Sequence, residues 1–244
     1  MVRPRGARGA INGPQPDERD RGDRAVLVGP VALWVSGRGR LPEIADDAVA
    51  VIGTARPSGY GSEVTAAIVT DATDRGMAIA ATGGPGIDAC ALSTAHQTGA
   101  RTVTVLSCGT DMAYRHHNHS LRHPHPAAGV LVSEYPPGTP TRPRRVAAAH
   151  RLLAALTRAT VLVEADPQCW SEVAVLWAQR LGRNTYAVPR PITSPTSRNG
   201  NYLIADHDLT AIASPRDIHL LAGPLPSEPF PQDSDADRSN GEPR

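Results

Sequence analysis

Lysine is absent from this sequence of 244 residues, so all 25 of its basic residues are arginines. Chemistry that needs a lysine amine, such as Schiff-base formation or the P-loop lysine of NTPases, is therefore excluded. The 24 acidic residues leave a formal net charge of only +1, which gives no reason to expect a general polyanion binder. A site for an anion must depend on a local group of arginines.

Cysteine is scarce as well, and the three that occur, Cys90, Cys108 and Cys169, are far apart. This number and spacing argue against a disulfide framework and against a cysteine-rich zinc site. No stretch reaches the roughly 18 apolar residues that a membrane span needs, and the Arg-rich N-terminus lacks the apolar segment of a secretory signal. We expect a cytoplasmic protein without a membrane partner.

The organisation of the chain indicates one α/β domain. Residues 1–24 and 223–244 are rich in Pro, Gly, Arg, Asp and Ser and are predicted to be disordered tails around a domain at 25–222. Short apolar runs alternate there with helical patterns, which is typical of a doubly wound, mostly parallel sheet of the extended Rossmann-like kind. The expected strands are 49–52, 77–81, 102–106, 130–132, 160–164 and 185–188, with a further edge strand considered at 31–35. The expected helices are 61–74, 88–98, 144–156 and 170–181.

The loops that follow the first four of these buried strands are rich in glycine and polar residues. Ligands of doubly wound sheets bind beyond the carboxyl ends of the strands. One such loop alone is better explained as a tight turn, but four at one edge favour a ligand site. The first two loops open helices whose N–H groups could hold a phosphate. The candidate binding residues in the four loops are Gly53, Thr54, Arg56, Gly61, Thr82, Gly83, Gly86, Asp88, Gly109, Tyr114, Ser133 and Glu134.

Several charged residues have two interpretations. Asp88 either caps the following helix or contacts a ligand. Glu134 and Glu164, at the ends of predicted strands, either accept hydrogen bonds from a ribose or base or hold a neighbouring arginine. A basic cluster at the start of the third expected helix either contacts phosphates or forms a solvated helix face. The cluster consists of Arg142, Arg144, Arg145, His150 and Arg151.

Catalysis and metal binding find little support in the sequence. No Ser-His-Asp arrangement and no Gly-x-Ser-x-Gly elbow can be identified, so we expect no catalytic residue. The histidines between residues 116 and 125 could suggest a metal site, but no cysteine or carboxylate lies at a familiar spacing. A surface loop is the better interpretation, and we expect neither metal nor another cofactor.

The order of motifs over roughly residues 30–215 resembles the DprA/Smf family of DNA-processing proteins. The most specific match is Ser133-Glu-Tyr-Pro-Pro-Gly-Thr-Pro140, and further matches lie at 49–54, 86–88, 108–111 and 201–204. The resemblance implies a non-catalytic protein that binds single-stranded DNA, forms a homodimer and loads the RecA recombinase during natural transformation.

This resemblance leads to a specific hypothesis for the DNA site. We expect backbone N–H groups at Gly53, Gly83 and Gly109 to hold the strand, and bases to stack or bond near Tyr114 and Tyr135. The expected phosphate contacts are Arg56, Arg144, Arg145 and Arg151.

Departures from the family pattern concern mainly arginines. Ala55, Pro85 and Ala149 stand where the family has arginines, and Leu92 stands where it usually has histidine. Each lost arginine removes a charge-assisted phosphate contact, which predicts weaker binding with a flatter salt dependence.

The alternative function is a nucleotide hydrolase related to the cytokinin-activating phosphoribohydrolases. Residues 166–172, which correspond to the glycine-rich loop of those enzymes, contain no glycine.

Overall fold

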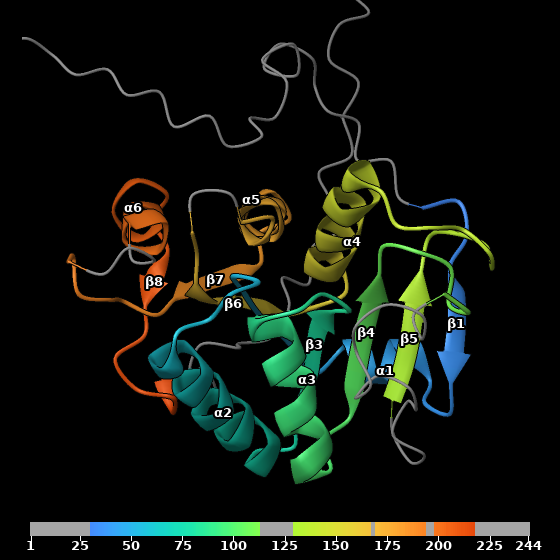
Figure 1. The fold of residues 1–244 in the computed structure, drawn as a ribbon. Coiled ribbons are helices and arrows are strands. Elements are labelled where there is room, and N and C mark those ends of the chain that lie inside the picture. Colours follow the sequence, from blue (N-terminus) through green and yellow to red (C-terminus); the bar gives the residue numbers. More distant parts are fainter. Residues whose placement is uncertain (1–29, 113–128, 167–168, 194–197, 218–244) are drawn as a thin grey trace, which may run out of the picture.

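A computed structural model describes residues 30–112, 129–166, 169–193 and 198–217 of the chain. These residues form one eight-stranded sheet with helices on both faces, and the strand order is β1-β5-β4-β3-β2-β6-β7-β8 (Figure 1). The strands are β1 (Trp34–Gly37), β2 (Ala48–Gly53), β3 (Ala78–Thr82), β4 (Thr102–Leu106), β5 (Gly129–Ser133), β6 (Ala159–Glu164), β7 (Asn184–Ala187) and β8 (Thr210–Ala211). The helices are α1 (Leu41–Ala45), α2 (Gly59–Asp74), α3 (Ile87–Thr98), α4 (Pro143–Ala155), α5 (Ser171–Arg180) and α6 (Arg198–Asp206).

The two faces of the sheet carry separate cores. Strands β2 to β6 are buried along their whole length, because parallel strands covered on both faces need apolar side chains in both directions. Ile68 of α2 and Ala91 of α3 pack against one face, and Leu153 of α4 and Val175 of α5 pack against the other. Figure 1 shows α2 and α3 below the sheet, with α4, α5 and α6 above it.

The chain reverses its direction across the sheet at one place. From β2 it moves outward through β3 and β4 to β5, and it then returns to place β6 on the other side of β2. All of these neighbouring strands are parallel. The gap between the carboxyl ends of β2 and β6 is therefore the topological switch point, where ligands of doubly wound sheets usually bind.

The sequence predicted the central elements well and the peripheral ones poorly. Six strands and four helices are confirmed within two residues at each end. The edge strand lies at Trp34–Gly37 instead of 31–35 and pairs antiparallel with β5. The elements α1, α6 and β8 were not predicted. Five residues in α1 and two exposed residues in β8 give little periodicity, and α6 has only nine residues.

The expected tails, the expected domain boundaries and the histidine-rich segment lie outside the described residues, so their structure stays a prediction. None of the helices in the described part of the chain combines the length and the apolar character that a membrane-spanning helix needs.

Candidate nucleic-acid interface

The loops after β2, β3, β4 and β5 lie along one edge of the sheet, called here the rim. This follows from the parallel pairing of these four strands, as the sequence predicted. Their glycine N–H groups, however, are already used inside the protein. Gly53 donates to Asp88 Oδ1 over 3.3 Å, Gly83 to the Val105 carbonyl over 3.1 Å and Gly109 to the Thr139 carbonyl over 2.9 Å. The expectation that these three groups hold a DNA strand is therefore wrong for this conformation.

Close packing explains the glycines better than ligand contact does. Gly86 has φ +87°, and a Cβ atom there would lie 2.1 Å from the Thr54 carbonyl oxygen. A Cβ atom on Gly109 would lie 2.6 Å from the carbonyl oxygen of Pro136. These positions need glycine because two loops approach each other closely, whatever the rim binds.

Asp88 joins the ends of β2 and β3 from inside. Its carboxylate is buried and accepts hydrogen bonds from the Gly53 N–H and from both the N–H (3.0 Å) and the hydroxyl of Thr82. Burial raises the pKa of Asp88, and the nearby His150 and the hydrogen bonds oppose that shift. Neither interpretation of Asp88 is correct, because its side chain neither caps α3 nor reaches the surface.

Thr54 and Ser133 have similar internal roles. Thr54 is buried, and its hydroxyl donates to Asp166 Oδ2 over 3.1 Å. The Ser133 hydroxyl donates to the Cys108 carbonyl over 2.7 Å and accepts from the Tyr135 N–H over 3.0 Å. These side chains shape the loops and are not available to a ligand on the surface.

One group of charged and aromatic residues lies on α4 and on the segment before it, and it is called here the α4 corner: Glu134, Tyr135, Arg142, Arg144, Arg145 and Arg151. Arg145 donates to the Pro140 carbonyl, and its guanidinium carbon lies 5.1 Å from the centre of the Tyr135 ring. Arg151 forms an ion pair with Glu134, which decides between the two interpretations of that carboxylate. Arg142 and Arg144 are exposed.

The α4 corner is partly desolvated. Burial raises the pKa of Glu134, while Arg151 partly offsets this effect. His150, which the sequence placed with the basic cluster, is instead buried and hydrogen-bonds through Nδ1 to the Val146 carbonyl at 2.9 Å. It does not contribute to the basic surface.

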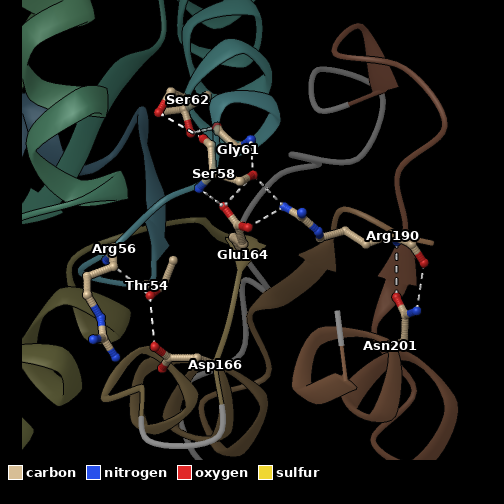
Figure 2. A network of polar contacts seen from close by, with 10 residues as sticks. Thr54, Arg56, Ser58, Gly61, Ser62, Glu164, Asp166, Arg190 and Asn201 are labelled. Atoms are coloured by element: carbon tan, nitrogen blue, oxygen red, sulfur yellow. Dashed lines mark hydrogen bonds and ion pairs between the residues drawn. The ribbon is translucent and has the colours of Figure 1, made fainter. Parts of the chain in front are cut away.

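A second group lies at the switch point and is called here the switch-point cluster: Ser58, Tyr60, Gly61, Glu164 and Arg190. Figure 2 shows the Glu164 carboxylate between the start of α2 and Arg190. Arg190 Nη1 lies 2.5 Å from Glu164 Oε1, and both side chains are almost fully buried. Ser58 donates to Oε2 of the same carboxylate through its N–H over 3.0 Å and its hydroxyl over 3.3 Å.

Glu164 takes the place that the sequence analysis gave to a phosphate. A Cβ atom on Gly61 would lie only 1.9 Å from Glu164 Oε2, so the carboxylate packs directly against the first turn of α2. The N-terminus of a helix favours a negative charge, and here the protein supplies that charge itself. The expectation that this turn holds a phosphate is therefore corrected. Glu164 is confirmed as a residue that holds an arginine.

Arg190 is the site residue that the sequence analysis missed. It follows β7 at the same rim, so the search beyond the carboxyl ends of the strands would have found it if extended to this strand. Asn201 of α6 fixes its backbone, accepting from the Arg190 N–H over 3.1 Å and donating to its carbonyl over 2.8 Å. The guanidinium carbon also lies 5.1 Å from the centre of the Tyr60 ring.

The four arginines that were expected to contact phosphates differ in their surroundings. Arg56 and Arg144 are exposed, whereas Arg145 and Arg151 have the internal partners described above. Arg56 follows β2 and the others follow β5, and β3 and β4 lie between these strands. The ends of β2 and β5 are therefore three strand spacings apart, which is roughly 14 Å. Tyr114 lies outside the described residues, so its role stays a prediction.

Comparison with known proteins gives the family. The model of the family described as DNA recombination-mediator protein A matches residues 24–221. The chain belongs to this family. A Mycobacterium tuberculosis relative that carries the name DprA is 36% identical over 194 residues, which are 80% of this chain and 50% of the relative. This member of the DprA/Smf family thus spans about half the length of that relative.

Solved structures support the same assignment. DNA processing protein A from Streptococcus pneumoniae is similar with a TM-score of 0.72 and 26% identity, covering 78% of this chain and 66% of that one. The Helicobacter pylori protein, whose single-stranded DNA binding mode has been described, has a TM-score of 0.71, 23% identity and coverages of 79% and 87%. The second match shows the fold alone.

Proposed function

We propose that this chain binds single-stranded DNA along the rim and carries out no reaction on it. The observation that carries the proposal is the α4 corner, where exposed arginines stand beside an arginine-stacked tyrosine in a member of the DprA/Smf family. Arginines supply phosphate contacts, and aromatic rings supply stacking surfaces for unpaired bases. The binding described for the Helicobacter pylori protein of the same fold supports this function.

The exposed arginines of the rim are the proposed phosphate contacts. Within the described residues, the guanidinium groups of Arg56, Arg142 and Arg144 have no hydrogen-bond or ion-pair partner, so a phosphate would not have to displace one. Arg145 and Arg151 instead position Tyr135 and Glu134. The proposed phosphate contacts of the rim are thus fewer arginines than the sequence analysis counted.

The proposed function also involves a second copy of the chain and a recombinase. We propose that a homodimer of this chain acts in the cytoplasm and delivers DNA to a RecA-type recombinase during DNA uptake, as the family resemblance implies. Sedimentation at several protein concentrations tests the dimer. The rate at which a recombinase assembles on protein-bound DNA tests the delivery, and no acceleration by this chain would contradict it.

The binding itself is tested by fluorescence anisotropy of a labelled oligonucleotide at several salt concentrations. We expect Arg144→Gln to weaken binding and to reduce the slope of log K against log salt by about 0.7, the contribution of one phosphate contact on a single strand. Arg75→Gln is the matched control. Arg75 lies at the C-terminal end of α2, away from the rim, and pairs with Asp71 over 2.9 Å. Absence of binding at low salt would overturn the proposed function.

The nucleotide hydrolase is the less favoured function. The substrate of such an enzyme carries a phosphate, which would bind at the switch point beside the start of α2. The Glu164 carboxylate and Arg190 already occupy this place. Incubation with nucleoside monophosphates and chromatography of the products would test it, and we expect no release of free base.

A further inference from the structure

We propose that Tyr60 is a second base-stacking position on the rim, built on the switch-point cluster and separate from Tyr135. This inference rests on the proposed DNA binding and adds to it a place where an unpaired nucleobase lies. The observation behind it is an exposed aromatic ring that lies against an arginine, which is itself held in place by an ion pair.

Tyr60 is unusually exposed for a large apolar side chain. It retains 47% of its accessible surface, and it is one of five large hydrophobic side chains in the described part of the chain with such exposure. Its position in the first turn of α2 places it directly after the loop that follows β2, and therefore on the rim. An exposed ring at this place is available to a strand that follows the rim.

The ring is held ready for stacking by Arg190. The guanidinium lies over the Tyr60 ring with its carbon 5.1 Å from the ring centre, while Glu164 and Ser58 bind the same guanidinium. Only 7% of the Arg190 side chain is exposed, so the cation cannot easily swing into solvent. A ring fixed in this way loses little conformational freedom when a base stacks on it.

A phosphate contact lies close to this ring along the chain. Arg56 is exposed four residues before Tyr60 in the same turn between β2 and α2. A cation in this loop and a stacking ring at the start of the helix match the alternation of phosphates and bases in a single strand. The α4 corner offers the same combination with Tyr135 and Arg144.

The closing experiment compares two labelled oligonucleotides of equal length, one of thymidines and one of abasic sites. We expect Tyr60→Leu to weaken binding of the thymidine strand about 5- to 100-fold and to leave binding of the abasic strand unchanged. Tyr60→Phe keeps the ring and should bind like the wild type. Tyr202→Leu is the matched control, because Tyr202 of α6 is similarly exposed at 51% and contacts His207 instead of an arginine.

The outcomes separate this inference from the function on which it rests. Equal binding of the thymidine strand by wild type and Tyr60→Leu overturns the stacking position and leaves DNA binding intact. Equal weakening of both oligonucleotides also overturns it, because the ring would then only shield the ion pair beneath it. If the wild type binds neither oligonucleotide, the proposed function itself fails.

Discussion

The α4 corner and the switch-point cluster contain the same three kinds of side chain, a glutamate, a tyrosine and arginine, in two different environments. At the switch point one arginine, Arg190, both pairs with Glu164 and lies over Tyr60. At the α4 corner two arginines divide these contacts, and the pair between Arg151 and Glu134 retains 27% and 12% exposure. Burial therefore makes the ion pair at the switch point a part of the fold, whereas the ion pair at the α4 corner stays partly exposed to solvent.

The largest difference between the two regions should appear when one partner of each ion pair is removed. We expect Arg190→Met to destabilise the protein by about 3–5 kcal/mol, because the buried Glu164 carboxylate would lose its compensating charge. Urea unfolding measures the loss. The double variant with Glu164→Gln should recover part of it, and a loss below roughly 1 kcal/mol would show that the pair is not buried in solution.

The next effect tests how closely Glu164 packs against α2. Gly61→Ala places a Cβ atom against the carboxylate and should cost about 1–3 kcal/mol. Gly59→Ala is the control in the same helical turn, because a Cβ atom there meets no atom within 4 Å. Thermal unfolding of both variants measures the difference. Equal stabilities would mean that Glu164 leaves this place and that the turn is open to a phosphate after all.

A smaller effect is expected at the α4 corner. Arg151→Met should cost roughly 1 kcal/mol, since partly exposed ion pairs contribute little. The raised pKa of Glu134 agrees with this, because burial outweighs the attraction of Arg151 there. The same urea titration measures it, and a cost equal to that of Arg190→Met would remove the distinction between the two regions.

The smallest effect concerns pH. The pKa of Glu134 lies above its ordinary value of 4.5 in the folded protein, so the folded state binds the proton more tightly than the unfolded state. Its contribution to stability is present below that value and is lost as the pH rises through the raised pKa. Glu134→Gln should therefore flatten the decline in stability above pH 4.5. Unfolding measured from pH 4 to pH 8 tests this, and an opposite change in slope would contradict it.

The sequence predicted the sheet because buried parallel strands are continuous apolar runs, as in Ala48–Gly53 and Ala159–Glu164. It also predicted the rim, which depends only on where these runs end. The sequence did not predict how the glycine N–H groups are used. It does not reveal that Asp88 and the Val105 carbonyl accept hydrogen bonds from the N–H groups of Gly53 and Gly83.

The partners of Glu164 in the switch-point cluster were missed for a related reason. Ser58, Glu164 and Arg190 come from three distant segments, and no local pattern relates them. Only the reversal of the strand order, which brings β6 beside β2, makes them neighbours. The residues that a side chain such as Glu164 binds thus depend on tertiary contacts more than on a local sequence motif.

The hydrogen bonds between Asn201 and the backbone of Arg190 give the last third of the chain an influence on the rim. The Asn201 amide accepts from and donates to one residue just beyond β7, much as a neighbouring strand would. A shift of α6 would therefore move Arg190, and with it the side of the Tyr60 ring that faces the cation. A helix near the C-terminal end of the described residues can thereby influence the surroundings of an exposed aromatic ring in the first turn of α2.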